Sequence, residues 1–207
     1  MNKKKLTIFD FDGVLINSEK NMEFTWNKTM QNHKSYKINF KKYRQYVGLP
    51  FYKILKNLKI NRKDFKKISI NYRKNSLFFE NKIKLFNGTK KVLEDTKKRS
   101  KIALFTSKDK YRTKFLLKKF KLKFDFVVTG NDVTKGKPNT EGLKKILNKF
   151  KIKKKFVCYI GDTHFDLKCA QKAKIRYIHA NWGFEKIKNS RNVIIIKNIK
   201  QLKKLLQ

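Results

Sequence analysis

Short apolar runs recur along the chain, each four or five residues long and each followed by small or polar residues. Runs of this length predict strands that are buried on both faces, as in a parallel sheet. We expect strands at residues 6–9, 101–105, 124–128, 156–160, 175–178 and 193–196. The intervening segments predict helices at residues 89–99, 109–120 and 139–150, in the stretch leading up to 173, and at 199–206. This alternation predicts an α/β fold with a Rossmann-like parallel sheet as its core.

Residues 18–86 follow a different pattern, because they contain no strand-like run and repeat their apolar residues at helical spacing. The repeats are Met22, Trp26 and Met30, then Phe40, Tyr43 and Val47, then Ile54, Leu55 and Leu58, and finally Phe65, Ile68, Tyr72 and Phe79. Gly48 interrupts the pattern, and Pro50 suits the start of the next helix. Such stripes usually form the core of a small helical bundle. We therefore expect an all-helical insertion at residues 17–86, between the two parts of a core formed by residues 1–16 and 87–207.

Two carboxylates, Asp10 and Asp12, directly follow the first predicted strand. Residues i and i+2 of an extended chain point the same way, so both acids can face one crevice while Phe9 and Phe11 face the packing. Gly13 then allows the backbone to turn sharply. Two like charges at close range resist ionising together, so this pair does not serve stability. Solvated acids at the end of an edge strand are the simpler alternative.

A second acidic pair, Asp162 and Asp166, follows the fourth predicted strand. Asp166 would lie in the first turn of the next helix, where an acid also suits the helix dipole, so function and helix stabilisation both account for it. Other polar residues at strand ends or on a nearby loop are Thr106, Ser107 and Lys137. Ligands of such sheets bind beyond the carboxyl ends of the strands. We therefore expect these side chains to line one site.

Several carboxylates in one crevice favour a hard divalent cation, and Mg²⁺ is the usual one. A hydroxyl at a strand end and a lysine can together hold a phosphoryl group. One carboxylate can attack phosphorus, and a second, two residues on, can protonate the leaving oxygen and later deprotonate water. The metal and Lys137 would neutralise the clustered negative charge. The candidate residues therefore point to phosphoryl transfer.

The same residues resemble the four motifs of the haloacid dehalogenase superfamily. In order along the chain, the matching segments are Asp10-Phe11-Asp12-Gly13-Val14, Thr106, Lys137-Pro138 and Gly161-Asp162-Thr163-x-x-Asp166. The helical insertion lies where that superfamily places its mobile cap, so the resemblance covers nearly the whole chain. It implies a Rossmann-like core with an inserted all-helical cap domain, and Mg²⁺-dependent transfer through a phosphoaspartate.

By this resemblance, Asp10 is the nucleophile and a metal ligand. Asp12 is the general acid/base and offers its backbone carbonyl to the metal. Dehalogenases of the superfamily lack this second acid and ion pumps carry threonine there, so Asp12 looks like that of a phosphatase or a phosphomutase. Trp182-Gly183, after the fifth core strand, is similar to the phosphoglycolate phosphatase branch, although Trp182 serves equally well as a packing residue.

The remaining motif residues would bind the phosphoryl group and the metal. By the resemblance, Thr106 and the backbone beside it at Ser107 hold the phosphoryl group, and Lys137 bridges it to the nucleophile. Asp162 binds the metal directly, and Asp166 acts through water or orients its neighbours. Ser107 stands where the branch usually has asparagine, which leaves the catalytic logic intact and alters the surrounding hydrogen bonds.

The leading hypothesis is a Mg²⁺-dependent phosphatase that hydrolyses a small phosphorylated metabolite. Phosphoglycolate, a sugar phosphate, a nucleoside monophosphate and a phosphorylated sugar acid all remain open as substrates. A phosphomutase of the same architecture is the first alternative. The second is a basic nucleic-acid-associated protein that keeps the phosphatase core as a scaffold, and the complete set of four acids argues against it. We expect a monomer or a homodimer.

The charge of the chain is unusual, because 55 Lys and Arg residues face 15 Asp and Glu residues and give a net charge of +40. The lysines are spread along the chain, arginine is scarce, and no DNA-binding or RNA-binding motif occurs. Lysine, asparagine, isoleucine and phenylalanine are all encoded by A- and T-rich codons, which favours compositional drift. We therefore do not expect specific nucleic-acid binding, and we expect non-specific adhesion to polyanions.

The sequence also predicts where the protein resides. No apolar run approaches the roughly 20 residues that cross a bilayer. The basic residues 1–5 precede too short an apolar stretch for a signal peptide. Cys158 and Cys169 have no metal-ligand neighbours and predict buried free thiols in a reducing cytoplasm.

His164 lies inside the fourth motif and could reach the site, but a solvated loop residue is the simpler interpretation. Arg44 and Lys53 flank Gly48-Leu49-Pro50 in the insertion, where relatives select substrate, but in so basic a chain surface positions are the simpler interpretation.

Overall fold

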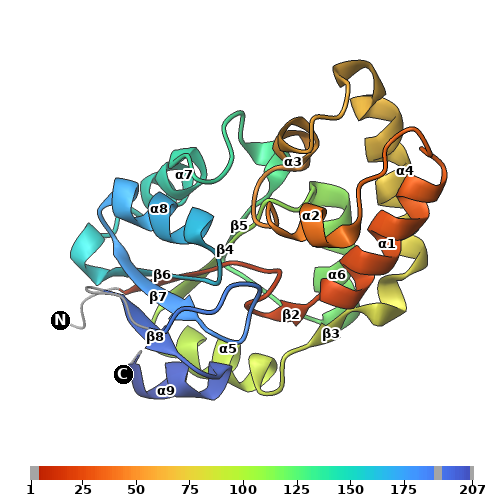
Figure 1. Ribbon diagram of the computed structural model, residues 1–207. Coiled ribbons are helices and arrows are strands. Elements are labelled where there is room, and N and C mark those ends of the chain that lie inside the picture. Colours follow the sequence, from red (N-terminus) through yellow and green to blue (C-terminus); the bar gives the residue numbers. More distant parts are fainter. Residues whose placement is uncertain (1–4, 189–192, 206–207) are drawn as a thin grey trace.

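A computed structural model, which describes residues 5–188 and 193–205, has a central sheet of parallel strands (Figure 1). The order across the sheet is β5-β4-β1-β6-β7-β8. The strands are β1 (Leu6–Phe9), β4 (Lys101–Phe105), β5 (Phe126–Val128), β6 (Val157–Gly161), β7 (Arg176–Ala180) and β8 (Ile194–Ile196). β1 is central, because it pairs in parallel with β4 on one side and β6 on the other. The Rossmann-like fold predicted from the sequence is confirmed.

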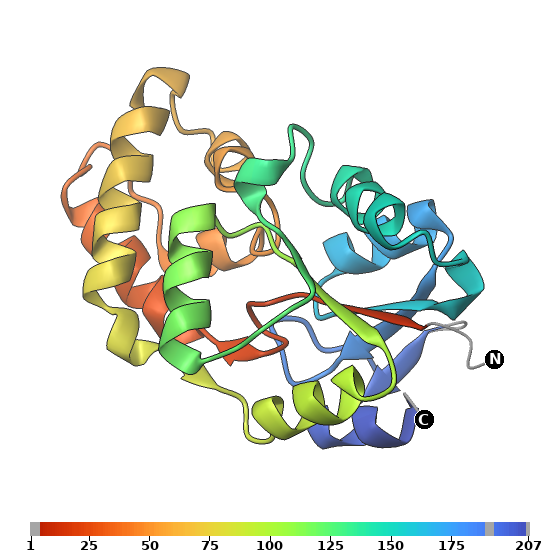
Figure 2. The same ribbon diagram turned by 180° about the vertical axis from the view of Figure 1, so that it is seen from behind.

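Helices cover both faces of the sheet, as Figures 1 and 2 show from opposite sides. Those on one face are α5 (Thr89–Lys97), α6 (Lys110–Phe120) and α9 (Leu202–Leu205). Those on the other face are α7 (Glu141–Phe150) and α8 (His164–Ala173). Successive side chains of β1 alternate between the two layers, with Phe9 in the first and Ile8 in the second. Burial on both faces explains why the central strands are continuous apolar runs.

The predicted elements differ from the observed ones mainly at their ends. The strand predicted at 124–128 begins only at Phe126, and the strand predicted at 175–178 continues to Ala180, which pairs with Ile196. The helix predicted at 199–206 is a 3₁₀ turn, Ile199–Gln201, followed by α9. Its predicted last residue, 206, and the basic residues 1–4 lie outside the described residues. Strand ends depend on pairing with neighbouring strands, which an apolar pattern does not encode.

Residues between β2 and β3 form a set of helices around a separate hydrophobic cluster, which Phe165 and Phe184 also join; we call these helices the helical unit. Its helices are α1 (Glu19–Gln31), α2 (Phe40–Arg44), α3 (Phe51–Asn57) and α4 (Phe65–Phe78). The predicted stripes meet in this core around Trp26, which is fully buried and stacks on Tyr43 with ring centroids 4.5 Å apart. Phe79, which was predicted to belong to the last stripe, lies just after the end of α4 and is not part of this core. Within the described chain, no helix has both the length and the apolar character needed to cross a membrane.

Two short antiparallel strands, β2 (Ile16–Asn17) and β3 (Lys84–Leu85), connect the helical unit to the sheet. The sequence predicted no strand between residues 18 and 86, so β3 corrects that prediction. Two residues are too few to show the alternation by which strands are recognised. The pairing brings the point where the chain leaves the core next to the point where it returns.

Candidate active site

Three buried carboxylates converge at the carboxyl ends of β1 and β6. Asp10 follows the last residue of β1, Asp162 follows the last residue of β6, and Asp166 lies in the first turn of α8. One oxygen atom from each of the three lies within 4.8 Å of the other two. Adjacent parallel strands end at the same edge of a sheet, so residues more than 150 positions apart in the chain meet here.

The surroundings of Asp162 fit a bound cation. Its Oδ2 accepts a hydrogen bond from the backbone N–H of Phe184 at 2.7 Å, whereas its buried Oδ1 has no hydrogen-bond partner among the described residues. Burial, together with the negative charges of Asp10 and Asp166, raises the pKa of Asp162 well above its usual value. A buried carboxylate oxygen without a partner is costly, and a hard divalent cation would satisfy it. Asp10, Asp162 and Asp166 are therefore suited to hold one.

Lys137 lies on the loop before α7 and connects two members of this acidic cluster. Its fully buried Nζ lies 2.8 Å from Asp10 Oδ1 and 2.9 Å from Asp166 Oδ1. Burial raises the pKa of Asp10 to about 7, although Lys137 opposes that shift. Burial alone would lower the pKa of Lys137, but the two carboxylates outweigh it and hold that pKa above its usual value. Lys137 is thus a permanent cation that fixes Asp10 in place.

Asp166 serves both the site and the start of α8. Its Oδ2 accepts hydrogen bonds from the backbone N–H and the hydroxyl of Thr163, at 3.1 and 2.6 Å, which forms a capping box. Its Oδ1 accepts a 2.6 Å hydrogen bond from the Tyr159 hydroxyl and also faces Lys137. Burial alone would raise the pKa of Asp166, but Lys137 and these donors hold it below its usual value. The structural and the functional interpretation of this residue are therefore compatible.

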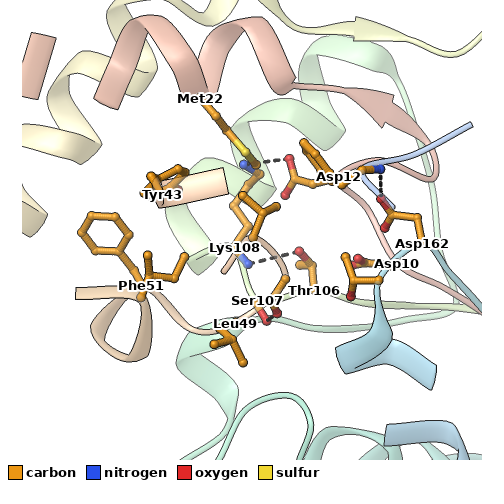
Figure 3. Close-up of a pocket in the computed structure, with 15 residues that line it drawn as sticks. Asp10, Asp12, Met22, Tyr43, Leu49, Phe51, Thr106, Ser107, Lys108 and Asp162 are labelled. Carbon is orange, nitrogen blue, oxygen red and sulfur yellow. Dashed lines mark hydrogen bonds and ion pairs between the residues drawn. The ribbon is translucent and has the colours of Figure 1, made fainter. Parts of the chain in front are cut away.

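Asp12 lies in the turn after β1, outside the three-acid cluster, and lines the pocket beside Asp10 (Figure 3). Its Oδ1 accepts a 2.6 Å hydrogen bond from the Ser18 hydroxyl and forms an ion pair of 3.1 Å with Lys108. Burial lowers the pKa of Lys108, although Asp12 opposes the shift. Sequence reasoning gave Lys108 no role of its own. Its position two residues after Thr106, close to the end of β4, could have indicated a role at the site.

Thr106 and Ser107 follow β4 and line the same pocket. The buried Thr106 accepts a hydrogen bond at Oγ1 from the backbone N–H of Lys108 at 3.1 Å. The Ser107 hydroxyl donates a 2.6 Å hydrogen bond to the carbonyl of Gly48 in the helical unit. The sequence assigned a role only to the backbone at Ser107, whereas its side chain contacts the loop between α2 and α3.

The pocket lies between the helical unit and the strand ends. Figure 3 shows Asp10 and Asp162 at one end of it and Tyr43 and Phe51 of the helical unit at the other. Its lining includes five of the seven predicted site residues: Asp10, Asp12, Thr106, Ser107 and Asp162. Lys137 and Asp166 do not line it and instead contact Asp10 or each other in the interior. The fold thus brings all seven predicted residues into one connected region.

Two residues make contacts that the sequence did not predict. His164 is partly exposed, as expected, but it is the first residue of α8 rather than a loop residue, and its Nδ1 lies 2.6 Å from Glu185 Oε1. Glu185 lies on the loop after β7, and the sequence did not predict that this loop would contact His164. Arg44 is a partly exposed surface residue, as expected, but it also forms an ion pair with Glu19 and donates a 2.9 Å hydrogen bond to the carbonyl of Phe184. It therefore links the helical unit to the core.

Trp182 and the two cysteines behave as packing residues. Trp182 packs against the hydrophobic layer that contains Phe9, and its Nε1 donates a 3.1 Å hydrogen bond to the carbonyl of Val14. Cys158 and Cys169 are buried free thiols, as predicted. Burial raises the pKa of Cys158 to about 11 and that of Cys169 to about 12. These three residues therefore pack in or against the core.

Comparison with known proteins gives relatives that match almost the whole chain. The chain is 28% identical to "Putative pyrophosphatase PpaX" of Caldanaerobacter subterraneus subsp. tengcongensis, over 97% of this chain and 93% of that protein. It is 26% identical to "Pyrophosphatase PpaX" of Bacillus mycoides, over 87% of this chain and 85% of that protein. The alignments therefore include both the sheet and the helical unit.

A solved structure has the same fold. A crystal structure described as a putative phosphoglycolate phosphatase from Lactobacillus plantarum superposes with a TM-score of 0.87 at 18% identity, covering 98% of this chain and 99% of that one. The model of one family, "Haloacid dehalogenase-like hydrolase", matches residues 7–180. That range contains all seven predicted site residues. The chain belongs to the haloacid dehalogenase-like hydrolase family.

Proposed function

We propose that the protein is a Mg²⁺-dependent phosphatase that hydrolyses a small phosphomonoester through a phosphoaspartate at Asp10. The observation that carries the proposal is the buried cluster of Asp10, Asp162 and Asp166, with Lys137 at 2.8 and 2.9 Å from two of them, next to a pocket. Membership of a hydrolase family supports the reaction class. Residues 17–86 would act as the cap, and residues 1–16 and 87–207 as the catalytic core.

The reaction proceeds in two displacements at phosphorus. A carboxylate oxygen of Asp10 attacks phosphorus, the bond from phosphorus to the ester oxygen breaks, and Asp12 gives its proton to the departing oxygen. Asp12 then removes a proton from water, which attacks the phosphorus of the phosphoaspartate and releases inorganic phosphate and Asp10. Thr106, the backbone at Ser107 and Lys137 would hold the phosphoryl oxygens. Bound Mg²⁺ would supply positive charge that offsets the charge of the phosphoryl group and the acidic cluster.

Pyrophosphate hydrolysis is a second candidate, because two relatives bear the name pyrophosphatase. It needs the same nucleophile and the same cation, with phosphate as the leaving group. A phosphomutase also uses this chemistry and differs in its products, because it conserves organic phosphate. Product analysis therefore separates a mutase from both hydrolases.

The test is phosphate release from a panel of phosphorylated metabolites and pyrophosphate, scored by kcat/KM. We expect turnover with Mg²⁺, loss of turnover on chelation, and recovery when Mg²⁺ is restored. Asp10→Asn removes the nucleophile and should abolish release while the thermal unfolding curve stays close to that of the wild type. Asp95→Asn is the matched control, because it alters a helix acid whose ion-pair partner among the described residues is Lys91, four residues away. Unchanged turnover in Asp10→Asn refutes the proposal.

The compartment and the assembly are further parts of the proposal. Two buried free thiols support a reducing compartment such as the cytoplasm. We also expect a monomer or a homodimer. Size-exclusion chromatography with light scattering measures the assembly directly, and a larger oligomer would contradict this expectation.

A further inference from the structure

The pocket has two chemically different sides. The core contributes carboxylates, hydroxyls and one lysine, as Figure 3 shows for Asp10, Asp12, Ser107 and Lys108, together with the ring of Phe184. The side chains that the helical unit contributes are Met22, Tyr43, Val47, Leu49, Phe51 and Ile54. Among the described residues, no charged side chain of the helical unit lines the pocket.

This absence contrasts with the composition of the chain. Lys and Arg account for 55 of 207 residues, so cations are abundant in the chain as a whole. Arg44 is nearby but is held by Glu19 and the carbonyl of Phe184. Arg112 is held by Asp109 and donates to Ser76. Neither arginine lines the pocket.

The polar atoms that do face the pocket are largely engaged already. The Tyr43 hydroxyl is hydrogen-bonded to that of Tyr72 at 2.8 Å. The Lys108 ammonium is paired with Asp12 at 3.1 Å. A second anionic group on a substrate would therefore lose its water without gaining a partner from the helical unit, which is unfavourable. An alkyl group in the same place would gain from burial.

The space is also small. The volume open to the centres of water-sized molecules is about 50 Å³. The lining is well packed, since Met22, Tyr43, Val47 and Ile54 are all buried. The small space favours a compact leaving group.

We propose that the enzyme selects phosphomonoesters whose leaving group is compact, uncharged and largely apolar. The inference rests on the proposed phosphatase function and names its substrate class. The phosphoryl group binds at Asp10, and the leaving oxygen takes a proton from Asp12 and departs as a neutral alcohol next to the apolar side chains. Pyrophosphate and phosphoglycolate, which place a second anion on that side, are poor substrates.

The experiment compares n-propyl phosphate with the phosphate ester of 3-hydroxypropionate, in which a carboxylate replaces the terminal methyl group. With Mg²⁺, we expect kcat/KM to be at least about tenfold higher for n-propyl phosphate. The kcat/KM values for phosphoglycolate and pyrophosphate should be as low as that for the anionic ester. Equal values, or a preference for the anionic esters, overturn the inference but leave the phosphatase proposal intact if Asp10→Asn abolishes release. No release from any compound overturns the phosphatase proposal itself, and the inference with it.

A charge placed in the pocket tests the same idea from the protein side. Phe51→Lys introduces a cation into the lining and should shift the ratio of the two kcat/KM values by about tenfold towards the anionic ester. Tyr52→Lys is the matched control, because this neighbour on α3 is 47% exposed and does not line the pocket, so the ratio should not change. If Phe51→Lys does not fold, Leu49→Lys replaces it. A folded variant that retains the wild-type ratio contradicts the inference.

Discussion

At the residue scale, the orientation of Asp12 depends on two neighbours. Ser18, just before α1, donates to its Oδ1, and Lys108, after β4, forms an ion pair with the same oxygen. The Lys108 side chain is only 3% exposed, so solvent screens this pair very little. A general acid must hold its proton within reach of the leaving oxygen. In the proposed mechanism, Lys108 therefore acts as a positioning residue for Asp12.

Replacing Lys108 tests this role. Lys108→Met should lower kcat by about 10- to 100-fold and change KM much less, because Asp12 loses its orientation while the rest of the pocket remains. Stopped-time phosphate assays over a range of substrate concentrations measure both constants. Lys110→Met is the control, since Lys110 lies two residues on and is 54% exposed, and its activity should match the wild type. Wild-type kcat in a folded Lys108→Met variant would show that Asp12 needs no such support.

The two thiols give a prediction that is independent of catalysis. Their raised pKa values, about 11 for Cys158 and about 12 for Cys169, mean that almost no thiolate exists at pH 8. The thiolate is the reactive form, so a disulfide reagent should react very slowly with the native protein. Both thiols should react rapidly after unfolding in guanidinium chloride. Rapid stoichiometric reaction of the native protein would contradict the burial of these residues.

At the element scale, the loop between α2 and α3 fits closely against the core. Gly48 has a φ of +102°, and a Cβ there would lie 2.9 Å from the Thr163 hydroxyl oxygen. Ser107 donates to the carbonyl of Gly48, and Gly136 has no room for a Cβ against Pro50. These contacts hold the helical unit against the core beside the pocket.

Gly48→Ala should therefore impair activity. The variant combines backbone strain of roughly 1–2 kcal/mol with a clash against the core, so the loop must move away from the pocket. Gly88→Ala has similar strain at a φ of +94°, but its Cβ would lie closest to the flexible side chain of Lys200 and would touch Ile199 only at an ordinary contact distance of 3.6 Å. We expect similar losses of melting temperature in both variants and a marked loss of kcat/KM only in Gly48→Ala. Equal effects on kcat/KM would show that the fit of this loop is unimportant.

The strands and loops also differ in how well the sequence predicts them. Strands such as β1 and β6 were predictable because burial on both faces makes them continuous apolar runs, and their carboxyl ends had to meet in a parallel sheet. The positions of Asp10 and Asp162 followed from that. β3 has only two residues and left no pattern. The contacts of Lys108 and His164 depend on how distant loops meet, so neither the pairing with Asp12 nor that with Glu185 was predictable.

At the scale of the whole molecule, charge is the most unusual property. The net charge of +40 is spread over the chain, which favours weak and sequence-independent attraction to polyanions. We expect unrelated DNA duplexes to bind with equal affinity in low salt and to dissociate steeply as the salt concentration rises. Fluorescence anisotropy at several salt concentrations measures this. Sequence-dependent binding that survives high salt would contradict compositional drift as the origin of the charge.

The two parts of the molecule contribute different properties to the reaction. The sheet supplies the acidic cluster and Lys137, and the helical unit supplies apolar side chains opposite them. In the proposed mechanism, the core therefore carries the chemistry and the helical unit the selectivity. In this account every step depends on Asp10, whichever substrate binds.

The most direct test is to trap the intermediate on Asp10. The enzyme is mixed with Mg²⁺ and its most active phosphomonoester, quenched in acid during turnover, and treated with sodium borohydride, which reduces an aspartyl phosphate to homoserine. Peptide mass spectrometry then locates the reduced residue, with a sample quenched without substrate as the control. Homoserine at position 10, dependent on substrate, is the predicted result. Turnover without modification of Asp10, or modification of a different residue, would contradict the account.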